Sequence, residues 1–446
     1  MGAPQRDPAT VSDGLVSRAV QISPPPFRAV LADADAPRTV WSAPDEATVV
    51  GSGTAATLTA DGPDRFQRIR DRAEALFATG DVHAGTEAAC PRLFGGFAFH
   101  DDGAERPPWT DFPGARFVFP RVQVTYADNG TWLTVNAVGP DVTPEAVEDR
   151  LEQERDRLES LPDPGPVCDP PGVRDRTRTT DLDDWRAGVD AAVSRIRSGE
   201  LRKVVLAQAL ECSLDSELSI PDILDRLAGK YPDCHRFLVE PVSGDASFFG
   251  ATPERLVTLH GRTVETGALA GTTGRGETPA EDEWLAEELM DSEKNVHEHE
   301  LVADAIRDQL SPFTASMSTG NRTVRRLATV QHLWTPITAE LAGDQHVLDL
   351  VEALHPTPAV GGLPPEKALD TIRDTEPFDR GWYAAPVGWI DAAGNGSFAV
   401  ALRSAVASGD VATLFAGVGV VADSDPDREW DEVQLKYRPI LDELEN

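Results

Sequence analysis

The sequence predicts a mixed α/β fold. Its 446 residues, 40% of them hydrophobic, can bury a large core, enough for about two to three average domains or one large α/β domain. Helical and strand patterns alternate along the chain, and a central strand pattern is apolar on both faces, as in strands inside a large sheet. No internal repeat is visible, so the sequence does not predict a repeat protein.

Residues 1–160 are expected to form a first α/β region. Strand patterns occur at 39–41, 93–99, 116–119 and 131–135, and helical patterns occur near 64–79 and 144–161. The glycine pair inside the second of these strands indicates a bulge or a close approach of two backbones, because a phosphate-binding loop would need more than this pair. We expect this region to complete the fold around the site.

A boundary is predicted at residues 161–180, which are rich in proline and glycine, and residues 181–446 form the second region. There, a helical pattern at 186–199 leads to a strand pattern at 201–210 that begins near Lys203. This lysine could extend its apolar stem to solvent. Alternatively, it could be partly desolvated, with a lowered pKa that suits a general base.

Strand patterns at 237–240 and 246–251 follow, and the second ends in Gly-Ala-Thr-Pro-Glu254. Glu254 could begin a turn or helix, or it could project as a proton donor. The glycine-spaced run 267–274 lacks the context of a dinucleotide motif, and close approach to an anionic ligand remains open. Later elements are a strand at 323–327, a stiff Pro/Gly loop at 355–364, and strands at 394–405 and 411–421.

One predicted helix, over residues 284–310, carries a carboxylate on its apolar face. Glu298 falls between Leu301, Val302 and Ile306 on the helical wheel. Because a buried lone carboxylate is costly, it should be protonated, paired with a cation, or bound to a metal. Lys294, one turn earlier, is a possible partner, and the helix alone does not decide between this pair and a metal ligand.

The predicted C-terminal helix, over 428–444, has one apolar stripe and a second stripe of Glu429, Glu432 and Lys436 beside it. The charged stripe could be an ordinary ladder of ion pairs. Its position at the edge of the core stripe also suits the wall of a cavity.

The net charge of −34 comes from 75 acidic against 41 basic residues, and only five of the basic residues are lysines. Such an acidic, lysine-poor surface is tolerable where salt screens it, so we expect a halophilic source, and we do not expect nucleic-acid binding. Four scattered cysteines indicate reduced thiols in a cytoplasmic protein. No signal peptide is visible, and no apolar stretch is long enough to span a membrane.

Nine segments together resemble the chorismate-utilising enzymes, and most closely the isochorismate synthases. They occur in the family's order and spacing over residues 180–446: Lys203-Val-Val-Leu, Gly250-Ala-Thr-Pro-Glu254, Leu269-Ala-Gly271, Ser292-Glu-Lys-x-x-His-Glu-His-Glu-Leu-Val302, His355-Pro-Thr-Pro-Ala359, Glu376-Pro-Phe-Asp-Arg380, Val387-Gly-Trp389, Leu414-Phe-Ala-Gly417 and Glu429-Trp-x-Glu-x-x-x-Lys436. Each segment is weak alone, but the ordered set is highly specific. The resemblance implies an anthranilate synthase component I-type fold, with two large antiparallel sheets and helices around a central cleft.

The resemblance also implies roles for individual residues. Glu298 and Glu432 match the carboxylates that hold Mg²⁺, and Glu429, Lys294 and His355 match positions around them and the substrate. Lys203 matches the general base that activates water for attack at C2 of chorismate. Glu254 matches the general acid that protonates the departing C4 hydroxyl. Positions that match contacts to the substrate are Gly271, Ala359, Val360, Tyr383, Arg403, Gly417 and Lys436.

The choice among family members depends on Ala359. Relatives that use ammonia, and the salicylate synthases, usually carry threonine here, whereas isochorismate synthases carry alanine, so water is the expected nucleophile. Two mild departures are Gly361, where serine is common, and Gln208, where arginine is frequent. The implied function is Mg²⁺-dependent isochorismate formation for menaquinone, siderophore or salicylate biosynthesis, without a glutamine amidotransferase subunit. The alternatives are a salicylate synthase that also eliminates pyruvate, and a catalytically silent chorismate-binding or partner protein.

Overall fold

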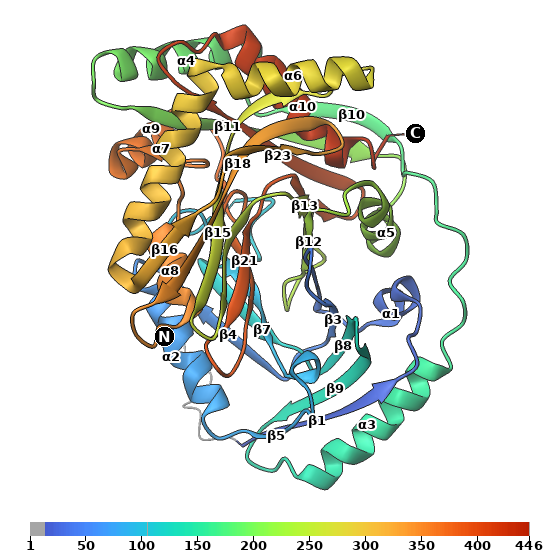
Figure 1. Cartoon of the computed structure of the whole chain (residues 1–446). Helices are drawn as coiled ribbons and strands as arrows, with labels where there is room; N and C mark the ends of the chain where they lie inside the picture. Colours follow the sequence, from blue (N-terminus) through green and yellow to red (C-terminus); the bar gives the residue numbers. More distant parts are fainter. Residues whose placement is uncertain (1–13, 105, 446) are drawn as a thin grey trace, which may run out of the picture.

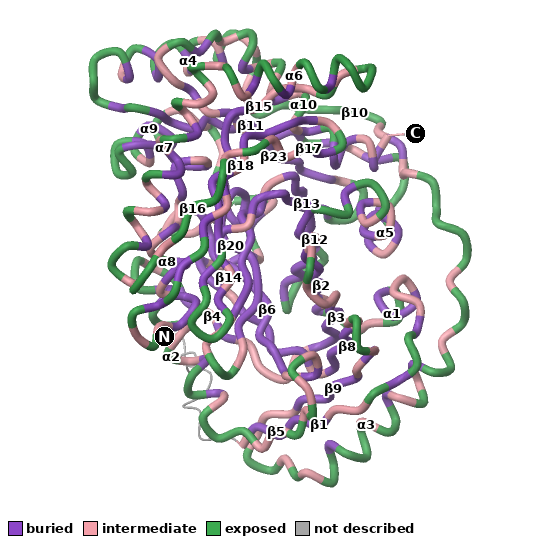
Figure 2. Tube along the Cα trace, in the orientation of Figure 1, coloured by how far each residue is buried: buried purple, intermediate pink, exposed green. Residues whose placement is uncertain are grey.

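The computed structural model of this chain describes residues 14–104 and 106–445. Two large β-sheets form its interior, and most of the helices lie around them (Figure 1). Buried residues follow the strands, whereas the outer faces of the helices are exposed (Figure 2). The mixed α/β fold with two large sheets is therefore confirmed.

The first sheet has 13 strands, with β19 paired to β11 beside the main path. In spatial order, the path is β10 (Val173–Arg178), β11 (Lys203–Leu214), β23 (Val411–Val420), β22 (Ser404–Ser408), β13 (Ser247–Thr252), β12 (His235–Val239), β2 (Arg38–Ser42), β3 (Thr48–Ser52), β8 (Val122–Ala127), β9 (Gly130–Val138), β1 (Leu15–Ile22) and β5 (Asp81–His83); β19 is Gly362–Leu363. All pairs in it are antiparallel except β1 with β5.

The second sheet has 10 strands, with β17 (Thr323–Arg326) paired to β18 beside the main path. In spatial order, the path is β16 (Thr314–Thr319), β18 (Val330–Leu341), β15 (Thr263–Gly274), β14 (Arg255–His260), β21 (Gly396–Val400), β20 (Pro386–Ile390), β6 (Leu93–Phe97), β7 (Ala115–Phe119) and β4 (Ala56–Ala60). Both sheets therefore combine strands from residues 14–160 with strands from the second half of the chain.

The helices lie mainly at the two ends of the molecule and along its sides. In Figure 1, α4, α6, α9 and α10 lie towards the upper end, and α3 lies along the lower end. The helix bounds are α1 Phe27–Asp33, α2 Arg65–Phe77, α3 Pro144–Glu159, α4 Leu182–Arg197, α5 Ile220–Lys230, α6 Pro279–Asp291, α7 Glu293–Leu310, α8 Val347–Leu354, α9 Pro365–Thr375 and α10 Pro426–Leu441, with short 3-10 turns at Glu87–Ala89 and Ser311–Phe313. No helix among the described residues is both long and apolar enough to cross a membrane.

The predicted helix over 284–310 is wrong in one respect, because it is two helices. The chain is extended at Ser292, between α6 and α7, and the Ser292 side chain accepts a hydrogen bond from the backbone N–H of Asn295. A serine in this position satisfies one of the free N–H groups of the first turn, so α7 begins as an independent helix. The wheel drawn through both segments therefore joined two helix axes.

Two other predicted boundaries also differ from the structure. The strand expected over 394–405 divides into β21 in the second sheet and β22 in the first, and Arg403 between them has a φ of +48°. Within the predicted linker 161–180, β10 forms an edge strand against β11, and only the part before it is an irregular connection. That connection runs up one side of the molecule from α3 (Figure 1).

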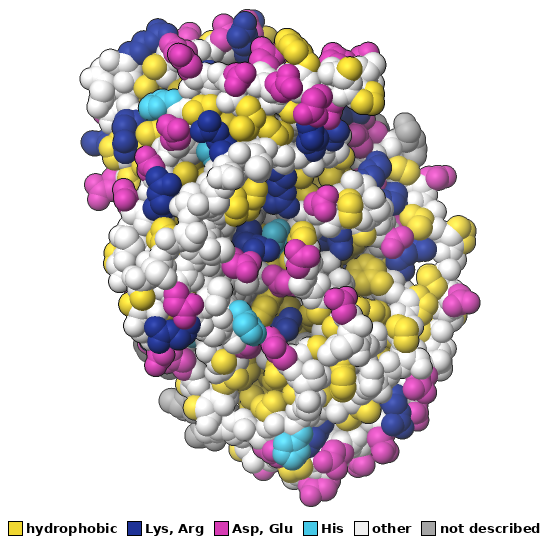
Figure 3. Space-filling view, viewed as in Figure 1, with side chains coloured by type: hydrophobic (Ala, Val, Ile, Leu, Met, Phe, Trp, Pro, Cys, Tyr) yellow, Lys and Arg dark blue, Asp and Glu magenta, His cyan; other side chains and the backbone are white. Residues whose placement is uncertain are grey.

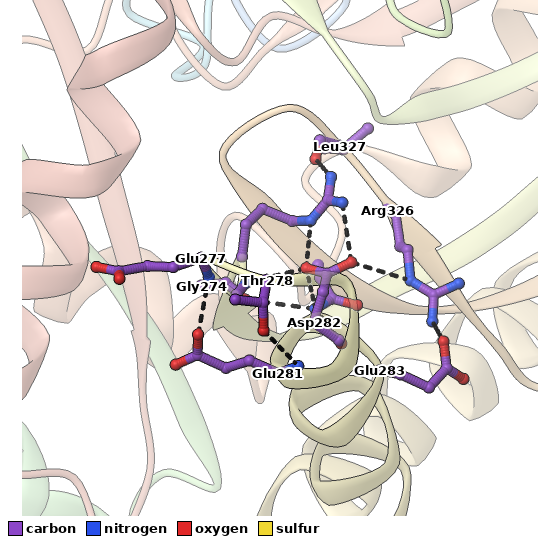
Figure 4. Close-up of polar contacts among 11 residues, drawn as sticks. Gly274, Glu277, Thr278, Glu281, Asp282, Glu283, Arg326 and Leu327 are labelled. Atoms are coloured by element: carbon purple, nitrogen blue, oxygen red, sulfur yellow. Dashed lines mark hydrogen bonds and ion pairs between the residues drawn. The ribbon is translucent and has the colours of Figure 1, made fainter.

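A buried polar network fixes the start of α6, next to the end of β15 (Figure 4). Asp282 accepts hydrogen bonds from Arg275 at 2.6 and 2.9 Å and from the backbone N–H of Gly276 at 3.0 Å. Gln331, on β18, also donates to Asp282, at 3.1 Å. The hydrogen bonds from Arg275 and Gly276 lower the pKa of Asp282 to about 2, so this network holds α6 to both strands as an ionised carboxylate.

Acidic side chains are scattered over the face of the molecule that Figure 3 shows. Asp and Glu side chains gather at the lower end of the molecule, over α3, and at the upper end (Figure 3). Basic side chains lie among them, mostly as arginines. The expectation of a halophilic source rests on this composition and stays a prediction.

Candidate active site

One cavity of about 360 Å³ lies between the two sheets and the helices α7 and α10. Every residue that lines it belongs to the range 203–436. Of the predicted site residues, it brings together Lys203, Glu254, Gly271, Lys294, Glu298, Ala359, Val360, Tyr383, Arg403, Gly417, Glu429, Glu432 and Lys436. Predicted residues from seven of the nine sequence segments therefore meet at one place.

Lys203 is the first residue of β11, and its side chain is 1% exposed. Its Nζ lies 2.8 Å from Oε1 of Glu298 on α7, whose side chain is 13% exposed. The alternative in which this lysine extends to solvent is therefore wrong. Burial would raise the pKa of Glu298, but the charge and hydrogen bond of Lys203 outweigh burial and lower it, so Glu298 is ionised.

The proposed partner of Glu298, Lys294, is also wrong. Its ammonium lies 3.8 Å from Oε1 of Glu429 on α10, and its side chain is 45% exposed. The sequence placed this lysine one turn from Glu298, but the ion pair that forms instead joins α7 to a strand far away in the sequence. A helical wheel shows neighbours on one helix and cannot show such a partner.

Glu254 lies where the chain passes from one sheet to the other. It follows β13 in the first sheet and precedes β14 in the second. Its carbonyl accepts a hydrogen bond from the backbone N–H of Val400, at 3.0 Å. Its side chain is buried, and burial raises its pKa to about 7, even though Lys203 and Arg403 oppose this change. A carboxyl group of this kind is partly protonated at neutral pH.

Arg403 lies where the chain crosses back from the second sheet to the first, between β21 and β22. The two passages are adjacent, since the backbone N–H of Ala251 donates to the carbonyl of Arg403 at 3.1 Å. Arg403 is 8% exposed, and no carboxylate among the described residues lies within ion-pair distance of it. Burial lowers its pKa, so an anionic ligand would stabilise this cation.

Helix α10 contributes two glutamates and a lysine to the cavity. Nζ of Lys436 lies 2.7 Å from Oε1 of Glu432 and donates to the carbonyl of Gly417 at 2.9 Å. Glu429 is 4% exposed, and its pKa is raised by burial and by the neighbouring Glu432. The charged stripe thus contains an ion pair and also forms part of the cavity wall, so both interpretations of this helix apply.

Two glycines allow close contacts in this cavity. Gly271 interrupts β15 at a bulge, with a φ of +76° that favours glycine. At Gly419 on β23, a Cβ atom would lie 2.7 Å from Oε1 of Glu298 and 2.9 Å from Cε of Lys203. The close packing of this ion pair against the strand therefore needs glycine at 419, a position that the sequence analysis did not select.

His355, which was expected to lie behind the residues that contact the metal and the substrate, does not itself line the cavity. Its Nε2 lies 3.1 Å from the carbonyl oxygen of Phe99, and its ring packs against Phe66 and Phe99. Burial lowers its pKa to about 3, so the ring is neutral. These contacts connect the loop before β19 to the residues that follow β6. The neutral ring is stable there because its neighbours are apolar and one ring nitrogen contacts a carbonyl oxygen.

The sequence analysis missed Arg380, which lines the cavity with 1% of its side chain exposed. It forms an ion pair with Glu376 at 2.6 Å and donates to the carbonyls of Val360 and Val205 at 2.8 Å. Glu376 in turn accepts from the backbone N–H of Ala207 at 2.8 Å. This pair therefore joins the loop that carries Val360 to the strand that carries Lys203. Arg380 lies four residues after Glu376, within the segment Glu376-Pro-Phe-Asp-Arg380, and this spacing of opposite charges could have indicated the pair.

His332, on β18, is a second cavity residue that was missed. It is 5% exposed, and its Nδ1 lies 3.0 Å from Oγ1 of Thr272. Burial and the nearby charges of Arg403 and Lys436 lower its pKa well below the usual range, so it is neutral. Ser292 and Asn295, which form the start of α7, also line the cavity. Ser292 and Asn295 lie inside one of the nine sequence segments, whereas no sequence pattern separates His332 from an ordinary strand residue.

The cavity offers carboxylate oxygens to a cation, from Glu298, Glu429 and Glu432. Within the described ranges, no three acidic, histidine or cysteine side chains come close enough together to form a metal cluster by themselves. Mg²⁺ does not require one, since it is usually held by one or two carboxylates while water and substrate oxygens complete its octahedron. An all-oxygen set from two helices fits such a hard ion.

Comparison with known proteins identifies the family. A family profile described as "Chorismate binding enzyme" matches residues 6–445. The isochorismate synthase MenF of Bacillus subtilis is 36% identical over 421 residues, which cover 91% of this chain and 88% of that protein. The salicylate biosynthesis isochorismate synthase of Pseudomonas aeruginosa is 38% identical over 421 residues, covering 92% and 86%.

A solved structure agrees with these sequence matches. The menaquinone-specific isochorismate synthase MenF from Escherichia coli superposes with a TM-score of 0.79 at 27% identity, covering 96% of this chain and 95% of that one. The resemblance drawn from the nine sequence segments is confirmed. With a profile match over nearly its whole length, this chain belongs to the family of chorismate-binding enzymes.

Proposed function

We propose that this protein is an isochorismate synthase that converts chorismate to isochorismate with Mg²⁺. One observation carries the proposal: a buried lysine, Lys203, and a buried carboxyl group with a pKa of about 7, Glu254, line the same cavity as an unpaired arginine, Arg403. The cavity thus has a candidate base, a candidate acid and a site for an anion. The names of its relatives, which are isochorismate synthases, support the same activity.

In the proposed reaction, Lys203 takes a proton from water, and the water oxygen forms a bond to C2 of chorismate. The two ring double bonds shift, the C4–O bond breaks, and Glu254 gives its proton to the departing oxygen, which leaves as water. One water is consumed and one is released, so the reaction is an isomerisation. The raised pKa of Glu254 supports its part, because an acid with a pKa near neutrality is protonated often enough to donate.

Chorismate carries two carboxylates, and the cavity can bind them with groups that are already fixed. Arg403 supplies a buried cation without an internal carboxylate partner among the described residues. Burial raises the pKa of Tyr383, so its phenol stays protonated and can donate. We assign substrate contacts to these two side chains, to Lys436, and to the backbone at Gly271, Ala359, Val360 and Gly417.

Glu298 and Glu432 would hold Mg²⁺, with Glu429 nearby. When bound, the ion would neutralise negative charge on the substrate and help to orient it. Glu298, on α7, and Glu432, on α10, face the same cavity, so they could bind one ion from two sides. Three lysines contact these carboxylates, and this concentration of positive charge supports a role for a cation at the same place.

Water, not ammonia, is the proposed nucleophile, because alanine occupies position 359 beside the cavity. We therefore propose that the enzyme acts without an amidotransferase subunit, in the cytoplasm, and feeds menaquinone, siderophore or salicylate biosynthesis. Residues 181–446 would carry the chemistry, and residues 1–160 would complete the sheets. The free cysteines at 90, 168, 212 and 234 are compatible with a reducing compartment.

The test uses the purified protein with chorismate and Mg²⁺ in concentrated KCl, with products separated by chromatography. Isochorismate that disappears with EDTA and does not respond to ammonium would support the proposal. Salicylate with pyruvate would make the protein a salicylate synthase instead. The absence of any product at every salt concentration would indicate a silent chorismate-binding protein.

A further inference from the structure

Three of the four glutamates that line the cavity, all of them on α7 and α10, each have their own lysine. Lys203 lies 2.8 Å from Glu298, Lys436 lies 2.7 Å from Glu432, and Lys294 lies 3.8 Å from Glu429. The whole chain has only five lysines. Three of them thus neutralise the acidic residues of one cavity, in a protein that otherwise uses arginine for positive charge.

The three pairs differ in how strongly they are held. Lys203 and Glu298 are 1% and 13% exposed, and they join β11 to α7. Lys436 and Glu432 are 12% and 29% exposed and lie one turn apart on α10. Lys294 is 45% exposed, and its contact is long. Because water and salt screen exposed pairs, the first pair is the strongest and the third contributes least.

The first pair occupies an oxygen that the proposed function assigns to the ion. Nζ of Lys203 lies 2.8 Å from Oε1 of Glu298, and both side chains are largely buried. The same Oε1 atom would also be needed by a divalent ion. The lysine and the ion therefore compete for one oxygen.

We propose that Lys203 is an internal counter-cation of Glu298, and that a divalent ion must displace its amine from Oε1 of Glu298 in order to bind there. Lys436 has the same relation to Glu432, more weakly. This inference rests on the proposed function and adds to it a competition between the lysine and the ion. The lysines lower the affinity for the ion, but they prevent repulsion among buried carboxylates when no ion is present.

The geometry around the pair supports this displacement. The strand that packs against it has glycine at 419, where a Cβ would lie 2.7 Å from Oε1 of Glu298 and 2.9 Å from Cε of Lys203. This glycine lets both side chains lie against the backbone of β23. The side chains line a cavity of about 360 Å³, so the amine has room to turn away from the carboxylate.

The test is the affinity for Mg²⁺, measured by titration calorimetry in concentrated KCl at pH 8 with Lys203→Met, Lys436→Met and Lys294→Met. Removal of any lysine makes the cavity more negative, so Lys294→Met measures the effect of charge alone. We expect Lys203→Met to bind Mg²⁺ at least about tenfold more tightly than the unchanged protein, and Lys294→Met to bind less than about threefold more tightly. Equal affinities for these two variants, or weaker binding by Lys203→Met, would overturn the inference.

A second measurement covers the case in which Lys203→Met does not fold. Lys436→Met breaks a more exposed pair, so its fold is less at risk, and it should also bind Mg²⁺ more tightly than Lys294→Met. If it does not, the inference is wrong. Failure of the proposed function gives a different result, because affinity is measured without turnover: ion binding with no isochorismate would reject the activity alone. Turnover in EDTA with no binding heat would reject the metal and this inference together.

Discussion

The cavity has two walls of different construction. Lys203, Glu254 and Arg403, here called the sheet wall, come from β11 and from the two passages between the sheets, and they are 1%, 6% and 8% exposed. Glu298, Glu429, Glu432, Lys294 and Lys436, here called the helix wall, come from α7 and α10. Backbone hydrogen bonds fix the sheet wall where the chain crosses between the sheets, whereas two side chains of the helix wall partly reach solvent, with Lys294 45% and Glu432 29% exposed.

This difference suggests a division of roles. Proton transfer needs groups in fixed positions with pKa values set by burial, and the sheet wall provides them. Cation binding needs oxygens that can adjust to an incoming ion, and the helix wall provides these. Substitution of Glu254 on the sheet wall should therefore affect the rate of reaction, and substitution of the glutamates on the helix wall should affect the affinity for Mg²⁺. Lys203 belongs to the sheet wall but contacts Glu298 on the helix wall, so its substitution should affect both.

The largest effect is expected for Glu254→Gln on the sheet wall. Without a proton to give to the C4 oxygen, kcat should fall by about 10²–10⁴-fold. The affinity for Mg²⁺, measured by calorimetry, should stay within about twofold of the unchanged protein, because the metal-binding side chains are on the other wall. A variant that keeps its kcat, or loses Mg²⁺ affinity instead, would break the separation of the two walls.

The same substitution should raise stability at high pH. The pKa of folded Glu254 is raised from 4.5 to about 7, so the stability that its protonated form allows is complete below pH 4.5 and is lost as the pH rises through about 7. Gln does not ionise, so by pH 8 the free energy of unfolding of Glu254→Gln should exceed that of the unchanged protein by about 3 kcal/mol. Urea unfolding at pH 5 and pH 8 would measure this, and an equal gain at both values would contradict the burial of an ionisable group.

On the helix wall, Glu298→Gln should weaken Mg²⁺ binding by at least about tenfold, because one of the proposed oxygen ligands loses its charge. The matched control is Glu300→Gln on the same helix, whose side chain is 60% exposed and 3.5 Å from Arg322. Activity of Glu298→Gln should partly recover at high Mg²⁺ concentration, whereas that of Glu254→Gln should not. Equal affinities for Glu298→Gln and Glu300→Gln would remove Glu298 from the metal site.

The smallest effect is expected for Lys294→Met. Its ion pair is long and half exposed, so its contribution to folding stability should be below about 1 kcal/mol and should decrease further in high salt. Thermal unfolding at low and high KCl would measure it. If Lys294→Met lowered the free energy of unfolding more than Lys203→Met does, the exposed pair would be the stronger one, which would contradict this comparison.

Much of this site could be predicted because most of its charged residues lie in short sequence motifs. Lys203, Glu254, Glu298 and Glu432 were each selected by a short pattern together with its order in the chain, and the structure brings all four to one cavity. The fold class followed from alternating patterns and from the same resemblance. Roles within the site are still predictions, which the substitutions above test.

The partners of these residues could not be predicted, because they depend on long-range packing. The Lys203 to Glu298 pair joins a strand to a helix, and a wheel of one helix offered only Lys294. The break at Arg403 has no glycine or proline to mark it, and its cause is the transfer of the chain between two sheets. The motif that contains His355 does not show its contacts, which are the carbonyl of Phe99 and the rings of Phe66 and Phe99.

The mixing of strands in both sheets has a consequence for cutting the chain. A fragment that begins at residue 181 would keep every side chain of the cavity, yet β12 would lose its pairing with β2, and β20 would lose its pairing with β6. β11 would also lose β10. Three rows of unpaired backbone N–H and C=O groups would be open to other copies, and such edges promote aggregation. The described residues before 181 thus cover three strand edges of the rest of the chain, even though they contribute no side chain to the cavity.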